Sequence, residues 1–591
     1  MIIPCPMARR ASALWSSTLA RPGVPIRCSS PRPWLRPFRS NCSIPRRTTD
    51  MSPSLAFLLL ALAPAFAQND TAARLARAFA AIDRAATAST APGMVVGITD
   101  RTRTLKIGAY GYANLNSKTR ITPETLFEIG SVSKSFTAIS LMELFDEDRF
   151  DPQEPVAKYL PWFALKSRYR AITGHDLLTH TSGLQNYRPD LASMPFAALS
   201  LRDFEPSYAP GEHYWYSNLG FQVLGYVLEH IDAAKYDTIV QRRILNRLGM
   251  SATHAAIDDA LRARLPQSYS HWPYTGEFTE EPWFEYLAAD GSIASTAGDM
   301  TAYARLILNR GVAPSGRLLS ERAFAQLTRP TLNSYAYGLF VRQDDGDTVI
   351  QHGGGIAGFQ TLLEMHMQDG FGIIAMGNGG LDRELVQFAI ASVKAALRDK
   401  PLPDPPARPS SAAITNSGDF AGLFSSGARS LEFSAAGNRL TLKQSGASIP
   451  LLRVQGDTFR VESGILAEYY FVFTRNAGKV TELSYGPDWY TSKAYTGPKQ
   501  FDTPPEFAAY AGRYVNHNPE EGAVHVFVRK GQLFLATGTG PGQRLLPAGP
   551  ATFRPGAPEF NPERISFDSI VEGHALRLLR SGMPMYRMDL R

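Results

Sequence analysis

Apolar and polar residues recur with two different periods along this chain, and the change of period divides it. Between residues 71 and 398, runs such as 71–86 and 381–398 space their apolar residues as on one face of a helix. Shorter alternating runs bounded by turn residues predict antiparallel strands, at 94–99, 105–112, 334–342, 347–352, 360–367 and 371–376. Terminal helices around a sheet, with a long helical middle section, indicate an α+β domain.

A proline-rich stretch at 399–412 marks the clearest predicted boundary, because its five prolines can neither continue a helix nor sit in a central strand. Beyond it the helical spacing stops. Short apolar or alternating runs bounded by Gly, Asn, Ser and Pro predict strands at 431–433, 439–442, 469–473, 524–528 and 532–535.

The strand-rich part also repeats itself. The segment 420–424 (FAGLF) returns at 510–514 (YAGRY), and 458–460 (TFR) returns at 552–554. We therefore predict two similar β-modules, 413–500 and 505–591, each large enough to close as a small barrel. Each match is short, so a chance repeat is the alternative.

Charge and cysteine are concentrated at the start of the chain. Residues 1–50 hold nine arginines, one acid and all three cysteines, so the net charge of +7 becomes −1 for residues 51–591. No basic cluster recurs downstream, and we expect no nucleic-acid partner. Thiol catalysis, Cys-ligated zinc and structural disulfides are excluded for the folded part.

Residues 51–67 resemble a secretory signal, with an apolar core and a small-x-small ending that predicts Gln68 as the mature start. Translation would then begin at Met51 of the 591-residue sequence, and the protein would be secreted or periplasmic. Alternatively, the Arg- and Ser-rich residues 1–50 fit a mitochondrial transit peptide. We expect no membrane span, because no segment is long and apolar enough.

Ser131 and Lys134 form the only Ser-x-x-Lys in the chain, and the apolar spacing after them predicts a helix that begins near Ser131. The two side chains are then neighbours on one helix face, and the hydroxyl lies among unpaired N–H groups that favour negative charge. The alternative is a capping serine and a solvated lysine. Because a lysine base must be neutral, catalysis requires Lys134 to be buried.

Two further patterns are common when taken alone. Tyr216-Ser217-Asn218 stands at the start of a predicted helix over 219–231, but Tyr-x-Asn also occurs at 112–114 and 514–516. His352 is followed by three glycines, which indicate either a turn or a strand edge that a substrate backbone can approach.

The three patterns in this order resemble the serine β-lactamase and penicillin-binding protein superfamily, in its class C β-lactamase-like and D-aminopeptidase-like branch. Segments 177–184 and 291–299 resemble structural landmarks of the same family. The resemblance implies a β-lactamase-like domain over 70–398, with an antiparallel sheet flanked by helices and a helical subdomain. The two β-modules would be lipocalin-like barrels.

Residue roles follow from this resemblance. Ser131 would be the acylated nucleophile, Lys134 its proton acceptor and Tyr216 the proton relay to the leaving group. The N–H groups of Ser131 and Gly355 would form the oxyanion hole. The residues expected to bind substrate are Asn218, His352, Gly354 and Gly355.

His352 stands where β-lactamases and D-Ala-D-Ala carboxypeptidases have lysine, and a mostly neutral imidazole holds a carboxylate less strongly. We therefore expect a D-aminopeptidase-like serine hydrolase acting on a small-molecule or peptide substrate. The alternatives are a β-lactamase or carboxypeptidase, an esterase, and a non-catalytic binding protein. Residues 537–543 are either a barrel loop that reaches the active site, as in D-aminopeptidases, or a surface hairpin.

The sequence indicates no cofactor and no metal. His175, His180, His352 and His366 form no recognised ligand motif, and we expect His175 and His180 to be structural. Phosphate-binding Gly-x-x-x-x-Gly-Lys and the Gly-x-Ser-x-Gly of α/β-hydrolases are both absent from the sequence. The oligomeric state stays open.

Overall fold

The structure, a computed structural model, describes residues 54–186, 193–271, 278–406, 413–444, 446–462, 464–517, 522–538 and 540–588. The expected leader (1–50), the start of the expected signal (51–53) and part of the expected linker (407–412) lie outside the described residues. The chain divides into two units at residue 65, and the second comprises residues 66–591. The three large sheets and the candidate site belong to the second unit.

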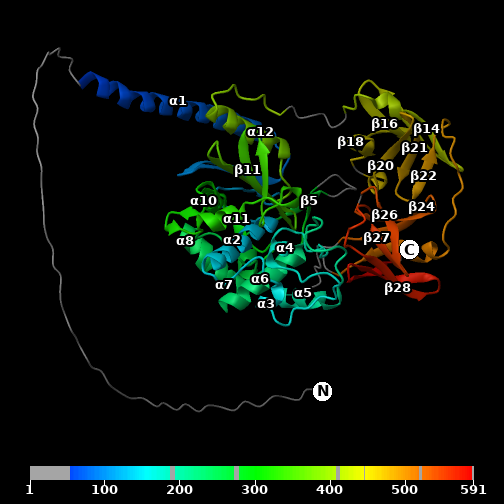
Figure 1. Ribbon diagram of the computed structural model, residues 1–591. Coiled ribbons are helices and arrows are strands. Elements are labelled where there is room, and N and C mark those ends of the chain that lie inside the picture. Colours follow the sequence, from blue (N-terminus) through cyan, green and yellow to red (C-terminus); the bar gives the residue numbers. More distant parts are fainter. Residues whose placement is uncertain are drawn as a thin grey trace, which may run out of the picture. The chain divides into compact units, whose positions relative to one another are not determined.

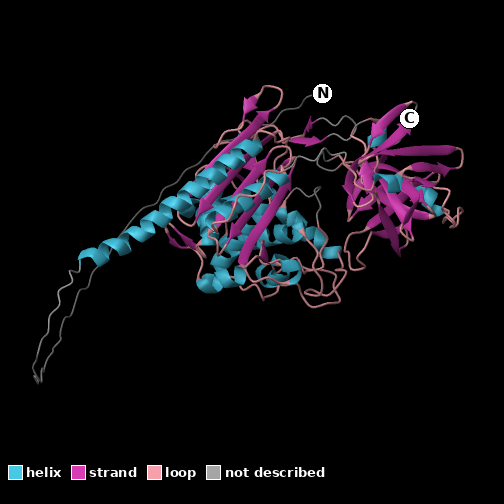
Figure 2. Cartoon of the chain, turned by 90° about the horizontal axis from the view of Figure 1, so that it is seen from above, coloured by secondary structure: helices cyan, strands magenta, loops and turns pink. Residues whose placement is uncertain are grey.

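A seven-stranded antiparallel sheet is the centre of the first part of this unit (Figure 2). Its order is β10-β11-β12-β13-β1-β2-β3. The strands are β1 (Gly93–Asp100), β2 (Thr104–Asn114), β3 (Thr119–Arg120), β10 (Phe340–Asp344), β11 (Asp347–Ile356), β12 (Phe359–His366) and β13 (Phe371–Gly377). The expected antiparallel sheet is confirmed.

Helices cover both faces of this sheet because successive side chains of each strand point to opposite sides. In β1, Met94 and Val96 pack in one core with α1 (Ser54–Ala86) and α12 (Arg383–Leu397). Val95, between them, points into a larger core on the other face. The expected first and last helices therefore flank one side of the sheet, as Figure 1 shows for α12.

The helical middle section packs on the other face. Its helices are α2 (Ser133–Asp146), α3 (Val156–Tyr159), α4 (Gly174–Leu178), α5 (Met194–Ser200), α6 (Asn218–Asp232), α7 (Tyr236–Val240), α8 (Asn246–Leu248), α9 (Asp259–Arg262), α10 (Ala297–Leu308) and α11 (Glu321–Leu327). Small two-stranded sheets pair β4 (Phe127–Glu128) with β7 (Ala294–Ser295), β5 (Tyr269–His271) with β6 (Phe278–Glu280), and β8 (Val312–Ala313) with β9 (Gly316–Arg317).

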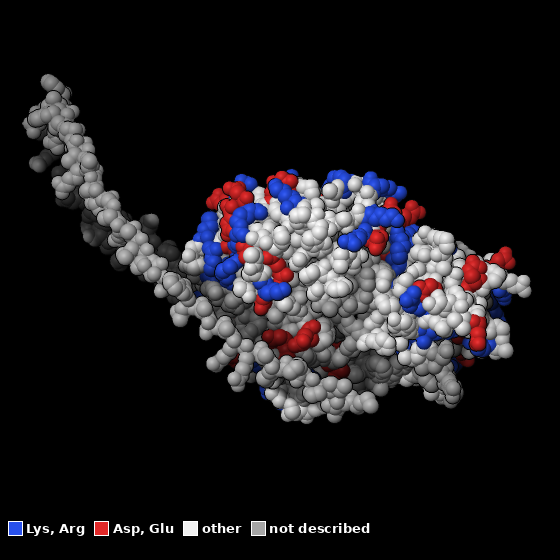
Figure 3. All heavy atoms as spheres, turned by 90° about the horizontal axis from the view of Figure 1, so that it is seen from below, with Lys and Arg blue, Asp and Glu red and all other residues white. Residues whose placement is uncertain are grey.

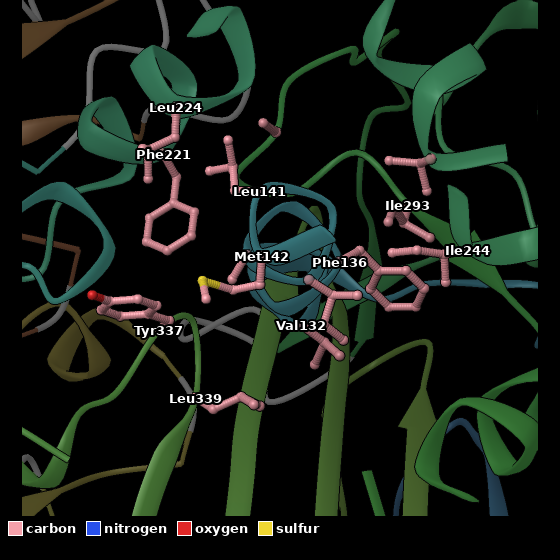
Figure 4. Close-up of a cluster of buried hydrophobic side chains, with 14 of the residues drawn as sticks. Val132, Phe136, Leu141, Met142, Phe221, Leu224, Ile244, Ile293, Tyr337 and Leu339 are labelled. Carbon is pink, nitrogen blue, oxygen red and sulfur yellow. The ribbon is translucent and has the colours of Figure 1, made fainter. Parts of the chain in front are cut away.

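Helix α2 is the buried axis of this section. All of its residues from Ser133 to Leu144 are buried, and Phe136 and Met142 pack among Phe221, Ile244 and other apolar side chains (Figure 4). A helix that is buried all round fixes the groups at its N-terminus.

The expected strand over 334–342 is wrong for its first half, since β10 begins only at Phe340. Gly338 has a left-handed φ of +68°, which breaks the extended run. A Cβ at Gly338 would lie 2.8 Å from the carbonyl oxygen of Lys134, so the segment bends to lie against α2. Tyr337 and Leu339 join the α2 core there (Figure 4).

Two β-modules follow, and the second is a closed eight-stranded barrel. Its strands are β23 (Gly512–Val515), β24 (Val524–Arg529), β25 (Gln532–Thr537), β26 (Gln543–Gly549), β27 (Thr552–Pro555), β28 (Ile565–Val571), β29 (His574–Arg580) and β30 (Met583–Met588), after helix α13 (Glu506–Tyr510).

The first module is a nine-stranded sheet that is nearly closed. Its order is β17-β16-β15-β14-β22-β21-β20-β19-β18. The strands are β14 (Gly422–Ser426), β15 (Arg429–Ala436), β16 (Arg439–Gln444), β17 (Ala447–Pro450), β18 (Leu452–Gln455), β19 (Thr458–Arg460), β20 (Phe471–Asn476), β21 (Lys479–Tyr485) and β22 (Asp488–Thr491).

The two modules repeat one plan. Both sequence repeats occupy matching places, at the turn of helix before β14 or β23 and on β19 or β27. In the second module β26 pairs with both of its neighbours, β25 and β27, which closes the barrel. Its counterpart in the first module is split into β17 and β18, each with one partner, so the expected first barrel stays open at that point.

Lysine and arginine side chains are interspersed with acidic ones on the surface seen in Figure 3. Such mixing agrees with the near-neutral sum of residues 51–591. Among the described residues, no helix has both the length and the apolarity required to cross a membrane.

Candidate active site

Ser131 and Lys134 lie together at the start of α2. Ser131 belongs to a 3₁₀ turn, Gly130–Val132, that leads directly into the helix. The Nζ atom of Lys134 lies 3.0 Å from Ser131 Oγ and donates to the carbonyl oxygen of Asp290 at 2.8 Å. The expected helix and the i, i+3 neighbourhood are therefore present.

Lys134 is fully buried, as a lysine base requires. Burial lowers the pKa of Lys134 to about 8, and the charge of Asp290 opposes that shift. At pH 7 roughly one molecule in ten then carries a neutral amine, against one in a few thousand for an ordinary lysine. The alternative of a solvated lysine is wrong.

Tyr216 closes the group from the other side. The Lys134 Nζ lies 4.9 Å from the centre of the Tyr216 ring, and the phenol shares a hydrogen bond with Ser131. Burial raises the pKa of Tyr216, so the phenol is neutral at neutral pH. The side chains of Ser131, Lys134 and Tyr216 thus converge although Tyr216 comes from a distant part of the chain.

The glycine run of β11 passes against the turn that carries Ser131. A Cβ on Gly354 would lie 1.9 Å from the carbonyl oxygen of Ile129, and a Cβ on Gly130 would lie 2.7 Å from the backbone nitrogen of Gly355. Only glycine at 130 and 354 permits this approach of two backbones. It brings the backbone amides of Ser131 and Gly355 to the same edge of the site.

Asn218 is the first residue of α6. Ser217 caps this helix, since its Oγ accepts from the N–H of Gly220 at 3.1 Å and donates to the carbonyl of Gln185 at 2.7 Å. The Oδ1 atom of Asn218 is buried and has no hydrogen-bond partner among the described residues. An acceptor of this kind suits an N–H donor from a bound molecule.

His352 is a buried, neutral side chain beside the site. Its Nδ1 lies 2.5 Å from the carbonyl oxygen of Gly353 and its Nε2 lies 3.1 Å from the Tyr335 hydroxyl. Burial lowers the pKa of His352 to about 3, with a smaller contribution from the Lys134 charge. His352 therefore supplies no cation to the site.

His175 and His180 have structural partners, as expected. His175 Nδ1 lies 2.8 Å from the Tyr337 hydroxyl. His180 accepts from the backbone N–H of Ser217 at 3.0 Å, and its ring lies 4.2 Å from that of Tyr216. His180 thus fixes the segment that carries Tyr216.

Tyr335 and Asp290 were not identified from the sequence. Tyr335 is fully buried and contacts both His352 and His180, while Asp290 receives the Lys134 hydrogen bond. Neither residue belongs to a recurring motif. Only the three-dimensional contacts reveal them.

The loop between β27 and β28 contacts the residues just before Tyr216 and the separate segment that ends at Asn186. Glu563 Oε1 accepts from the backbone N–H of Asn186 at 2.7 Å and from the indole N–H of Trp215 at 3.2 Å. The ring of Phe560 stacks on His213 with centroids 4.0 Å apart. The last barrel therefore holds the outer side of the segment that carries Tyr216.

A cavity of about 350 Å³ lies beside this contact and reaches Asn218. Asn186 and Trp215 line it together with barrel residues that include Thr537 and Gln543. The two ends of the segment 537–543 thus face the neighbourhood of Asn218. Residue 539 of that segment lies outside the described residues.

In the described part of the chain, one cluster has metal-ligand chemistry, namely Asp347, His366 and Asp369. His366 already lies 3.0 Å from both Asp347 Oδ2 and Glu364 Oε1. Asp369 pairs with Arg398 at 2.8 Å. These groups satisfy one another and stand at the end of β11 opposite its glycine run.

Comparisons with known proteins identify the family of the first domain. The model of the Beta-lactamase family matches residues 76–397, which is more than half of the chain. An unguisins hydrolase of Aspergillus campestris is 29% identical over 313 residues, covering 49% of this chain and 58% of that protein. Penicillin-binding protein 4* of Bacillus subtilis is 23% identical over 333 residues, 51% of this chain and 71% of that protein.

Similarity to a solved structure extends further along the chain. A penicillin-binding protein homologue from Pyrococcus abyssi superposes with a TM-score of 0.53 and 18% sequence identity, over 78% of this chain and 98% of that one. At this identity the likeness concerns the fold. The chain covers 58–59% of the unguisins hydrolase and of protein flp from Staphylococcus aureus. On the family match and the fold together, the chain belongs to the beta-lactamase family.

Proposed function

We propose that the protein is a serine hydrolase that forms an acyl-enzyme on Ser131 and cleaves small peptides, amides or esters in the manner of a D-aminopeptidase. The observation that carries the proposal is the 3.0 Å contact between Ser131 Oγ and the fully buried amine of Lys134. A buried amine with a pKa of about 8 is a competent base near neutral pH, whereas a solvated lysine is not.

Acylation begins when Ser131 Oγ attacks the carbonyl carbon of the substrate. As the C–O bond forms, the hydroxyl proton passes to Lys134, whose amine becomes an ammonium. The N–H groups of Ser131 and Gly355 donate to the developing oxyanion, and loss of one such donor commonly costs about 3–4 kcal/mol. Tyr216 relays the proton to the leaving amine or alcohol, whose bond to the carbonyl carbon breaks.

Deacylation repeats these steps with water as the nucleophile. As the water oxygen attacks the acyl carbon, Tyr216 accepts a proton from the water and passes its own proton to Lys134; the bond between the acyl carbon and Ser131 Oγ then breaks and Lys134 returns a proton to Oγ. The unpartnered Oδ1 of Asn218 would accept from an amide N–H of the substrate, which the lack of a protein partner for this atom supports.

The neutral state of His352 supports substrates without a free carboxylate at this position. Both of its ring nitrogens already have protein partners, so no cation faces a carboxylate there. This supports aminopeptidase-like or esterase chemistry over β-lactamase or D-Ala-D-Ala carboxypeptidase activity. The similarity to an unguisins hydrolase also supports a hydrolase activity.

A side-by-side substrate screen tests the proposal. Purified wild type and Ser131→Ala are assayed on D-amino-acid amides, p-nitrophenyl esters and nitrocefin. We expect Ser131-dependent turnover of the amides or esters, with nitrocefin much slower. Predominant nitrocefin turnover would overturn the inference from His352.

A non-catalytic binding protein on the same scaffold is the rival hypothesis. It predicts that neither a fluorescent penicillin nor a fluorophosphonate labels the protein in a Ser131-dependent way. The buried, hydrogen-bonded Ser131–Lys134 pair argues against it, because a pure binding protein has no need of a desolvated amine.

A further inference from the structure

Asp290 is a buried acid that the proposed mechanism does not use. Its side chain is 4% exposed, in the loop before β7. Both of its carboxylate oxygens lie close to the Tyr286 hydroxyl, at 2.9 and 3.0 Å. Burying an acid is costly unless a partner compensates for the lost water, so its position next to the catalytic pair requires an explanation.

The loop that carries Asp290 is bonded directly to α2. Thr137 Oγ1 donates to the carbonyl of Ala289 at 2.7 Å, and Lys134 Nζ donates to the carbonyl of Asp290 at 2.8 Å. Two successive carbonyls therefore accept from two side chains one turn apart on the helix. This arrangement holds the Lys134 amine beside Ser131 Oγ, and the Tyr286 hydroxyl holds the carboxyl of Asp290.

The other titratable groups around Lys134 are neutral near pH 7. Burial lowers the pKa values of His180 and His352, and it raises those of Tyr216 and Tyr236. Among the described residues, Asp290 supplies the charge that opposes the effect of burial on Lys134. Burial raises the pKa of Asp290 itself, and the Lys134 charge opposes that shift in turn.

We propose that Asp290 is a positioning residue of the acylation step, whose carbonyl oxygen holds the Lys134 amine on Ser131 and whose carboxylate stabilises the ammonium that forms there. The inference rests on the proposed function. When the Ser131 proton moves to Lys134, a positive charge appears on a fully buried side chain. An opposite charge held nearby stabilises that product most where solvent screening is weakest.

The rate at which a fluorophosphonate labels Ser131, measured across pH 5–10, tests this without a known substrate. In the wild type we expect the rate to fall below about pH 8, as Lys134 becomes protonated. Asp290→Asn keeps the carbonyl and the shape but removes the charge. The pKa of Lys134 then falls further, so the acid limb moves to lower pH by about one to three units.

The plateau rate of Asp290→Asn is expected to fall about 3- to 30-fold, because a weaker base accepts the proton less readily and only part of each pKa unit appears in the rate. Asp290→Glu, which restores a carboxylate, is expected to recover part of the shift. Asp259→Asn is the matched control, since Asp259 is an exposed acid on α9. It should leave both the midpoint and the plateau unchanged. Asp290→Ser replaces Asp290→Asn if the latter does not fold.

The outcomes separate the two proposals. Labelling of Ser131 with the same midpoint and plateau in wild type and Asp290→Asn would overturn the role of Asp290 and leave the hydrolase proposal standing. Loss of rate with an unmoved acid limb would also contradict it, because a merely structural role produces that result. Absence of any Ser131-dependent adduct in the wild type would overturn both.

Discussion

The two sides of the candidate site are held in different ways. Ser131 and Lys134 stand on one buried helix, and their neighbours Ile129 and Val132 are fully buried in the large core around α2. Tyr216 and Asn218 lie on a segment whose inner side is bound by His180 and whose outer side is bound by the last barrel, through Glu563. The Ser131 side, on α2, is thus fixed locally, whereas the Tyr216 side, next to the barrel, depends on a contact 348 positions away along the chain.

Substitutions on the two sides are therefore expected to have different effects. Under the proposed mechanism, changes on the α2 side remove the groups that react. Changes on the barrel side leave these groups in place and only loosen their alignment, so they lower the rate less.

The largest effect is expected at Lys134. Lys134→Met keeps an unbranched side chain in the core but removes the base, so we expect kcat/KM and the labelling rate of Ser131 to fall by about 10²- to 10⁴-fold. Steady-state kinetics measure the loss of activity, and thermal melting measures whether the variant keeps the stability of the wild type. Lys158→Met, at an exposed lysine, is the control and should retain full activity. An active Lys134→Met would remove lysine from the mechanism.

Gly354→Ala is expected to come next. Its added Cβ would meet the Ile129 carbonyl at 1.9 Å, so β11 must move away from the turn that carries Ser131. We expect a loss of about 10²- to 10³-fold in kcat as the Gly355 N–H leaves the oxyanion position. Gly353→Ala is the matched neighbour, because its Cβ meets nothing closer than 3.7 Å. Equal activity of both variants would show that this backbone approach does not matter for the reaction.

The smallest effect is expected on the barrel side. Glu563→Ala removes the acceptor for Asn186 and Trp215 and for the Ser581 hydroxyl. We expect kcat to fall about 3- to 30-fold through looser placement of Tyr216, while Glu563→Gln recovers part of the loss. Glu559→Gln, an exposed acid in the same loop, should behave as wild type. A fall in kcat as large as that of Lys134→Met would contradict the expectation that substitutions on the barrel side have smaller effects than those on α2.

The same contrast explains what the sequence could predict. The Ser131–Lys134 pair follows from local spacing on one apolar helix, and the burial of Lys134 follows from the chemistry required of it. The sheet and the second barrel follow from alternation and from the repeat. Tyr335, Asp290 and Glu563 act through contacts between segments far apart in the chain, for which one sequence contains no spacing rule. The bend at Gly338 belongs to the same class, because it is set by the backbone of Lys134.

The most direct test of the central claim is the site of covalent labelling. The wild type and Ser131→Ala are treated with a fluorophosphonate, digested, and the peptide covering residues 121–134 is fragmented to separate Ser131 from Ser133. We predict one adduct per chain, on Ser131, and none in Ser131→Ala. An adduct on another residue, or one that persists in Ser131→Ala, would contradict the account.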